Sequence, residues 1–149
     1  RTEELGLDRI RPLMTAPRTK GGAITKAAAE VGATVGAKFL VTFTQSGDSA
    51  RRISRLRSPI PILAITPEDG TFNRLALSWG VESLVTPMVK HTDEMVLQAD
   101  KMLLDGKRAN EGELVMIVAG SPPGIPGSTN AMRVHKVGDA VNGVAAAYR

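Results

Sequence analysis

Apolar and polar positions along this chain recur with the spacing of helices and strands that follow one another in turn. Between residues 24 and 35 the apolar positions fall three or four apart, which predicts a helix that packs on a sheet through small side chains. The continuous apolar run at 39–43 predicts a strand buried on both faces. Further strands are predicted at 61–66, 82–88, 114–120 and 131–137, and further helices at 50–57, 67–79 and 92–106.

This alternation predicts an α/β domain with a parallel sheet and helices on both faces. The last run alternates in the manner of an edge strand, with Met132 and Val134 on one side and His135 on the other. Trp79 closes an apolar helical face and is predicted to pack against the sheet. We expect one domain over 21–149, preceded by a lead-in segment over 1–20.

The turn after the first predicted strand carries side chains suited to an anion. Thr44, Ser46 and Ser49 supply hydroxyl groups, and Gly47 lets the backbone approach a ligand closely. The helix that follows begins with N–H groups that lack internal partners and carry partial positive charge. A strand, a hydroxyl-rich turn and a helix start together predict a phosphate-binding site.

Two other interpretations of this region remain open. Ser46 or Asp48 can serve simply as the cap of the helix, a position that Ser and Asp often occupy. The arginines on the polar side of that helix can form a solvated face, although Arg51 and Arg52 lie early enough to reach an anion.

A second polar loop follows the most apolar predicted strand. Residues 121–130 are rich in glycine, proline and hydroxyl side chains. In doubly wound sheets, ligands bind beyond the carboxyl ends of the strands, where the strand order reverses. If the first and fourth strands are neighbours, the two loops face each other and can hold one phosphorylated ligand between them.

Composition narrows the class of ligand and partner. The net charge of +4 suits a phosphorylated small molecule, and only 3% of residues are aromatic, which disfavours nucleic-acid binding by base stacking. The 149 residues include no cysteine, and His91 and His135 lie far apart, so no metal site is predicted. No apolar run is long enough to span a membrane and no signal peptide is recognisable, so we expect a cytoplasmic protein. Because the chain starts at Arg1 rather than at methionine, we expect a fragment or a processed product.

Several motifs, taken together and in this order, resemble the C-terminal domain of the pyruvate kinase family, bacterial type. The resemblance covers roughly 21–138 and rests on Thr44–Arg51, Pro61–Pro67, Leu77–Glu82, Val118–Gly120 and Gly127–Asn130. It implies an open five-stranded sheet whose last strand is antiparallel and whose first and fourth strands lie side by side. It also implies a regulatory domain that binds a phosphorylated effector within a homo-oligomer, a tetramer in the parent enzyme, where the last strand contributes to a subunit interface.

The resemblance further implies roles for individual residues. Five residues of the first turn would bind a phosphate, and four of the second loop would close over the ligand: Thr44, Gln45, Ser46, Gly47 and Ser49, then Gly124, Gly127, Ser128 and Thr129. A sugar monophosphate or AMP is favoured over fructose 1,6-bisphosphate, because Asp48 would repel phosphate and Ile125-Pro126 offers no charge to a second one. The alternative is a purely structural tetramerisation domain that binds no effector.

The catalytic part of such an enzyme is not expected in this chain. In the family, phosphate passes from phosphoenolpyruvate to ADP, giving pyruvate and ATP, in a preceding (β/α)8 barrel with magnesium (Mg2+) and potassium (K+) ions. We therefore predict neither catalytic residues nor a cofactor in this chain. A free-standing hydrolase that uses the serine and threonine loops would need a general base, and neither His91 nor His135 is predicted beside them.

Overall fold

The computed structural model describes residues 19–120 and 129–143. Almost all of the predicted lead-in segment lies outside the described residues, as do Gly124, Gly127 and Ser128 of the second loop. The helices are α1 (Lys20–Val35), α2 (Asp48–Arg55), α3 (Asp69–Leu75) and α4 (Thr92–Asp105). The strands are β1 (Leu40–Phe43), β2 (Ile62–Thr66), β3 (Val81–Val85), β4 (Leu114–Gly120) and β5 (Thr129–Lys136).

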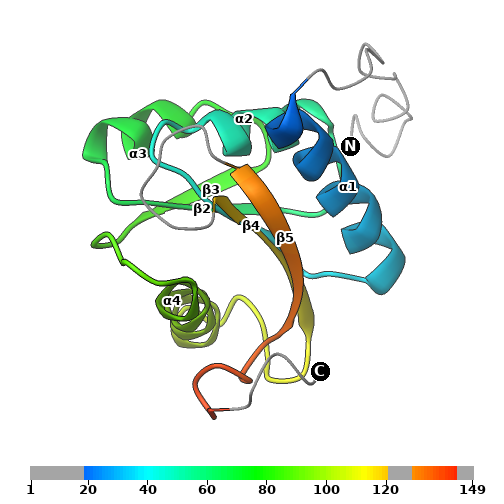
Figure 1. The fold of residues 1–149 in the computed structure, drawn as a ribbon, viewed down its shortest axis with the longest axis vertical. Helices are drawn as coiled ribbons and strands as arrows, with labels where there is room; N and C mark the ends of the chain where they lie inside the picture. The colour runs from blue at the N-terminus through cyan, green and yellow to red at the C-terminus, as the bar shows by residue number, and fades with distance from the viewer. Residues whose placement is uncertain (1–18, 121–128, 144–149) are drawn as a thin grey trace.

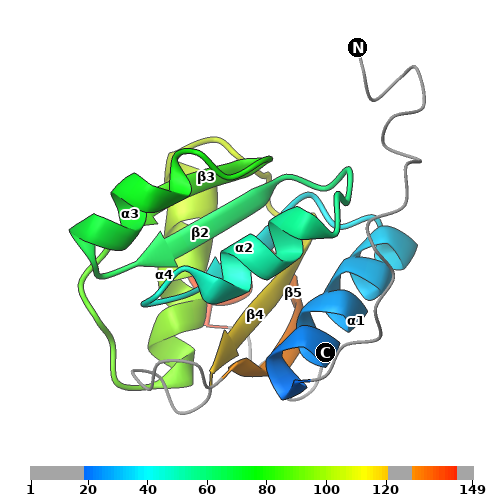
Figure 2. The same cartoon turned by 90° about the horizontal axis from the view of Figure 1, so that it is seen from above.

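The five strands form one sheet in the order β3-β2-β1-β4-β5. The first four strands are parallel to one another, and β5 runs antiparallel to β4 at the edge. Figure 1 shows β5 along the front of the molecule, and Figure 2 shows the sheet from above, beneath three helices. The expected α/β class, the antiparallel last strand and the side-by-side first and fourth strands are confirmed.

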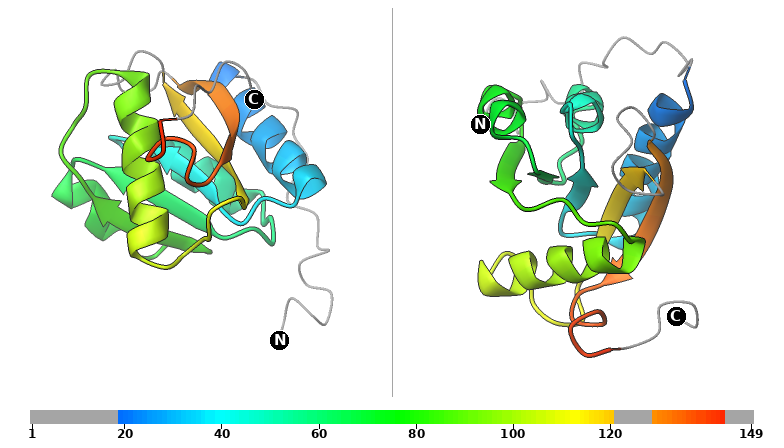
Figure 3. Two further views of the ribbon diagram at one scale, coloured as in Figure 1. Left: turned by 90° about the horizontal axis from the view of Figure 1, so that it is seen from below. Right: turned by 60° about the vertical axis from the view of Figure 1, so that its left-hand side comes forward.

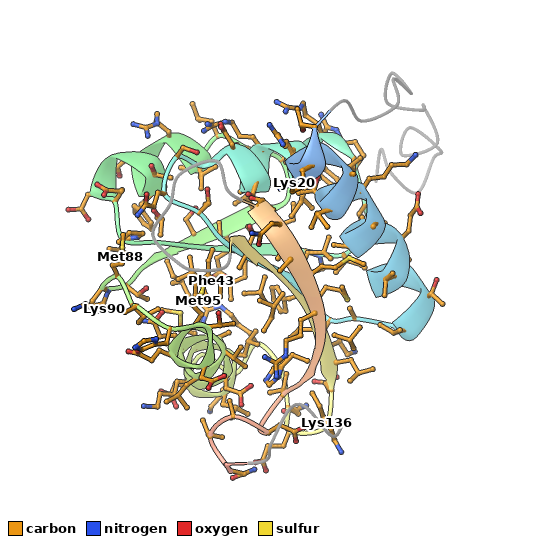
Figure 4. The ribbon with its side chains drawn as sticks, viewed as in Figure 1. Lys20, Phe43, Met88, Lys90, Met95 and Lys136 are labelled. Atoms are coloured by element: carbon orange, nitrogen blue, oxygen red, sulfur yellow. The ribbon has the colours of Figure 1, made fainter. Side chains whose placement is uncertain are left out.

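Helices cover both faces of the sheet, three on one face and one on the other (Figure 3). On the first face, Ala28 of α1 and Ile53 of α2 pack over Leu40, Ile62 and Met116 of the strands. On the second face, α4 packs its apolar residues against the opposite sides of the same strands: Val96, Ala99 and Leu103 lie against Val41, Leu63 and Val115. In Figure 4, Phe43 projects into this second layer, between the sheet and α4.

The region after α3 differs from the sequence-based prediction. The helix ends at Leu75, and the residues up to Gly80 form turns, so Trp79 is not helical. The Trp79 ring lies under the guanidinium of Arg57, whose Cζ is 4.8 Å from the ring centroid. Trp79 is therefore only half-buried, with a cation–π contact to Arg57 on its ring.

The buried face of the edge strand β5 is the one that carries His135, and the face that carries Met132 and Val134 is the more exposed one. His135 is only 3% exposed, whereas Met132 and Val134 are 37% and 43% exposed. His135 lies opposite Val115, whose side chain belongs to the core under α4. Its Nε2 is 2.6 Å from Oδ1 of the fully buried Asp100 in α4, which supplies the polar partner that a buried imidazole needs.

Candidate functional site

The turn at 44–49 and Thr129, the first described residue after β4, meet beyond the carboxyl ends of β1 and β4. These strands are adjacent and parallel, so the segments that follow them emerge at the same edge of the sheet. The hydroxyl oxygens of Ser49, at the start of α2, and Thr129, at the start of β5, are 2.6 Å apart and share a hydrogen bond. The expected juxtaposition of the turn at 44–49 and the end of the second loop is therefore observed.

Hydrogen bonds within the turn fix its conformation. The Thr44 hydroxyl accepts the Gly47 N–H at 2.8 Å, and the Ser46 hydroxyl accepts the Asp48 N–H at 3.3 Å. Gly47 has a φ of 90°, a conformation that side chains rarely allow, and it occupies the cap position of α2 itself. Gly47, and neither Ser46 nor Asp48, occupies the N-cap position of α2, but the Ser46 hydroxyl accepts the first N–H of the helix and so fills part of the capping role that the alternative interpretation gives it.

The Arg51 side chain, in the first turn of α2, folds back over the turn at 44–49. Its Nη2 donates to the Ser46 carbonyl at 3.0 Å and to Oδ1 of Asp48 at 2.7 Å. Gly47 is buried, and a Cβ atom on it would lie 2.7 Å from Nη1 of Arg51 and 3.3 Å from Thr71. The close approach that we expected a ligand to make at Gly47 is therefore made by the protein's own guanidinium.

Two further contacts tie the turn to neighbouring elements. The Thr71 hydroxyl of α3 donates to the Gln45 carbonyl and in turn accepts a hydrogen bond from Nη2 of Arg74 at 2.9 Å. The Gln45 amide nitrogen lies 3.5 Å from the sulfur of Met88, in the segment that follows β3 and is labelled in Figure 4. The Gln45 side chain thus points across the ends of the strands toward β3.

The amino-terminal end of α1 lies beside the Ser49–Thr129 hydrogen bond. The Thr19 hydroxyl accepts two hydrogen bonds, from the Gly22 N–H at 3.0 Å and from Nη1 of Arg52 at 3.0 Å. A Cβ atom on Gly21 would lie 2.5 Å from that Nη1 and 3.6 Å from Cβ of Thr129, so a side chain there would displace the end of Arg52. None of the predicted site residues lies at this end of α1. The Thr-Lys-Gly-Gly run before the apolar helical pattern is the signal that could have found it.

The arrangement gathers hydroxyl groups, a helix N-terminus and two guanidinium groups, which together can bind an anion. The two histidines lie elsewhere: His91 is exposed at the start of α4, and His135 is buried against Asp100. Within residues 19–120 and 129–143, no group of three or more His, Asp and Glu side chains is placed to hold a metal ion. The same part of the chain contains no helix with the length and apolar character needed to cross a bilayer.

An open, mostly parallel sheet with helices on both faces defines the class of doubly wound α/β domains. Within this class, the family model for the pyruvate kinase alpha/beta domain matches residues 22–135. The chain belongs to the pyruvate kinase family, in the part that this domain represents.

Individual relatives agree with this assignment. The chain is 48% identical over 128 residues to the pyruvate kinase of Mycobacterium tuberculosis, a match that covers 86% of this chain and 27% of that protein. It is 42% identical over 131 residues to the pyruvate kinase of Corynebacterium glutamicum, covering 88% of this chain and 28% of the relative. A solved structure of Cryptosporidium parvum pyruvate kinase in complex with ADP superposes with a TM-score of 0.75 at 27% identity, over 83% of this chain and 25% of that one.

Proposed function

We propose that this chain is the effector-binding and assembly domain of a pyruvate kinase, which transfers phosphate from phosphoenolpyruvate to ADP. The observation that carries the proposal is the 2.6 Å contact between Ser49 and Thr129, because it joins the turn at 44–49 to the end of the second loop. Membership of the pyruvate kinase family supports the activity assigned to the whole protein. The relatives extend well beyond the part matched here, and the chemistry belongs to that remainder, with Mg2+ and K+ as its ions.

The proposed effector carries one phosphate, as a sugar monophosphate or AMP does. The phosphate would contact the hydroxyl groups of Ser46 and Ser49 and the first N–H groups of α2, with Arg51 and Arg52 as the nearby cations. Gln45, Thr44 and Gly47 hold the turn in shape from beneath, since Thr44 and Gly47 are buried and hydrogen-bonded to each other. Thr129, hydrogen-bonded to Ser49, would contact the ligand beside that serine.

Assembly is proposed to use the edge strand β5. Its partly exposed Met132 and Val134 face the same side as Met116, which α1 covers, and the strand forms the outer edge of the sheet. Edge strands with exposed apolar side chains readily join a second chain. A homo-oligomer through this strand also suits the alternative function, a tetramerisation domain that binds no effector.

Calorimetric titration of the folded chain with a sugar monophosphate, AMP and fructose 1,6-bisphosphate tests the effector role. Saturable binding of a monophosphate is expected, and Ser46→Ala together with Ser49→Ala should weaken it by roughly 10- to 100-fold, the loss of one or two hydrogen bonds to a charged group. Thr34→Ala, which removes an exposed hydroxyl on α1, is the matched control. If no phosphorylated metabolite binds, effector binding is wrong and only the structural alternative remains.

Sedimentation of the whole protein tests assembly. Met132→Lys combined with Val134→Lys should shift the protein to smaller assemblies, because two charges would be buried at the interface. Leu77→Lys is the control. The Leu77 side chain is 95% exposed and precedes β3, the strand at the edge of the sheet opposite β5, so this change should leave the assembly unchanged. An unaltered mass in the β5 variant would remove this strand from the interface.

A further inference from the structure

Asp48 and Arg51 form an ion pair directly over the candidate phosphate turn. Both residues belong to the first turn of α2, and the guanidinium donates at the same time to the Asp48 carboxylate and to the Ser46 carbonyl. The contact is partly open to solvent, with 34% of the Arg51 side chain and 57% of the Asp48 side chain exposed. Asp48, which as an isolated charge would repel phosphate, is thus paired with a cation beside the turn.

We propose that Arg51 binds the phosphate of the effector directly and that Asp48 is an internal competitor for the same guanidinium. This inference rests on the proposed function, since it assumes that the turn at 44–49 receives a phosphate. In the free protein Asp48 occupies Arg51. In the complex the phosphate oxygens take its place, and the carboxylate returns to water.

The geometry favours such an exchange over a fixed structural pair. Nη2 already lies 3.0 Å from a carbonyl of the turn, so an anion seated on Ser46 is within reach of the guanidinium without movement of α2. A guanidinium binds phosphate through two parallel hydrogen bonds, and a dianion attracts it more strongly than one carboxylate does. Asp48 is exposed at the helix start, so its release uncovers no buried charge.

The competition gives the site a preference for doubly charged ligands. A phosphate monoester dianion can displace the carboxylate, whereas a phosphodiester or a carboxylate with a single charge only equals it. Asp48 thereby becomes a residue that sets specificity and affinity without contacting the ligand, and Arg51 the residue on which it acts.

Titration with inorganic phosphate at low ionic strength tests the inference on the folded chain and four variants. Arg51→Ala should raise the Kd about 10-fold, the loss of a charge-assisted contact. Asp48→Asn should lower the Kd about 5-fold, because Arg51 is then free before binding. In the Arg51→Ala background the same Asp48→Asn change should gain less than about 2-fold. Arg55→Ala, one turn further along α2, removes an equal charge from an exposed position and is the control for net charge.

The outcomes separate this inference from the proposed function. If the chain binds phosphate but Arg51→Ala leaves the Kd unchanged, or changes it no more than Arg55→Ala does, direct binding by Arg51 is wrong and the site itself stands. A gain from Asp48→Asn that is equal or larger in the Arg51→Ala background overturns the competition. If neither the chain nor its Asp48→Asn variant binds phosphate, both the inference and the effector site fall.

Discussion

Asp100 and Asp48 are each the acidic partner of a nitrogen-bearing side chain, but they lie in opposite surroundings. Asp100 is fully buried in α4, and three nitrogen atoms lie within hydrogen-bond distance of its carboxyl group: Nε2 of His135 at 2.6 Å and the N–H groups of Ala140 and Val141, which donate at 2.8 and 3.2 Å. Asp48 is exposed and contacts one arginine on its own helix. The first carboxylate joins three elements, whereas the second joins one helix to itself.

This difference separates a structural contact from an exchangeable one. Removal of one partner from a buried pair leaves polar groups without hydrogen bonds and out of reach of water, so it is costly. An exposed pair is replaced by water at little cost. The Asp100 cluster therefore fixes the edge strand β5 and the residues after it to α4, while the Asp48–Arg51 pair leaves its cation available to a ligand.

The largest expected effect comes from Asp100→Ala. This change leaves the buried His135 and two partly buried backbone N–H groups without their acceptor, and it should lower the free energy of unfolding by about 3–5 kcal/mol. Urea denaturation followed by circular dichroism measures the loss. Asp105→Asn, at the exposed end of α4, is the control and should stay within about 0.5 kcal/mol of the parent chain. A loss under about 1 kcal/mol for Asp100→Ala would abolish the contrast with Asp48.

Thr42→Val tests whether a buried polar group stabilises the fold when, unlike Asp100, it has no hydrogen-bond partner. Thr42 is fully buried in β1, and its hydroxyl has no hydrogen-bond partner among the described residues. Valine keeps the shape and removes the unpaired hydroxyl, so the free energy of unfolding should rise by about 1 kcal/mol. The same urea titration gives the sign. A marked loss of stability would show that the hydroxyl is satisfied in solution.

The order of elements and the meeting of the two loops could be predicted from sequence because both follow from short-range patterns. Apolar runs and helical spacing gave the strands and helices, and the rule for strand ends placed Ser49 near Thr129, as the structure shows. The boundaries were less predictable: β3 begins at Val81 rather than Glu82 and ends at Val85, because pairing with β2 sets its length.

The features that sequence could not give depend on partners distant in the chain. The alternation in β5 indicates two faces but does not show which of them is buried. The face that carries His135 is the buried one, because Asp100 of α4 lies within hydrogen-bond distance of that imidazole. A carboxylate among apolar helical positions is ordinarily assigned to solvent, so Asp100 gave no signal by itself. Likewise, the sequence does not show that the Arg51 side chain folds back over Gly47, because this contact depends on the three-dimensional shape of the turn.

Glu82 and Arg108 form a pair whose exposure lies between the two extremes. Nε and Nη2 of Arg108 donate to the two carboxylate oxygens at 2.8 and 2.7 Å, and these hydrogen bonds lower the pKa of Glu82 from its ordinary 4.5. A lowered pKa contributes stability above the unfolded value and loses it as the pH falls through the folded one. Glu82→Gln should therefore reduce the free energy of unfolding by about 0.5–1 kcal/mol at pH 7.

Urea titrations of both proteins between pH 7 and pH 3 measure this contribution. The difference between them should stay constant above the ordinary pKa of 4.5 and narrow below it as Glu82 becomes protonated. Glu94→Gln, at an exposed position in the first turn of α4, is the control for loss of a carboxylate. A difference that does not narrow in acid would mean that Arg108 does not lower the pKa of Glu82 in solution.

The smallest effect on stability is expected for Asp48→Asn, and it completes the contrast with Asp100. The variant loses one exposed ion pair and one favourable charge at the start of α2, which together should change the free energy of unfolding by no more than about 0.5 kcal/mol. Thermal melting in the absence of phosphate measures this change. A loss as large as that of Asp100→Ala would make Asp48 a structural residue and Arg51 unavailable to any ligand. A near-neutral result, combined with tighter phosphate binding, would mean that the carboxylate sets the affinity of the turn and contributes little to the fold.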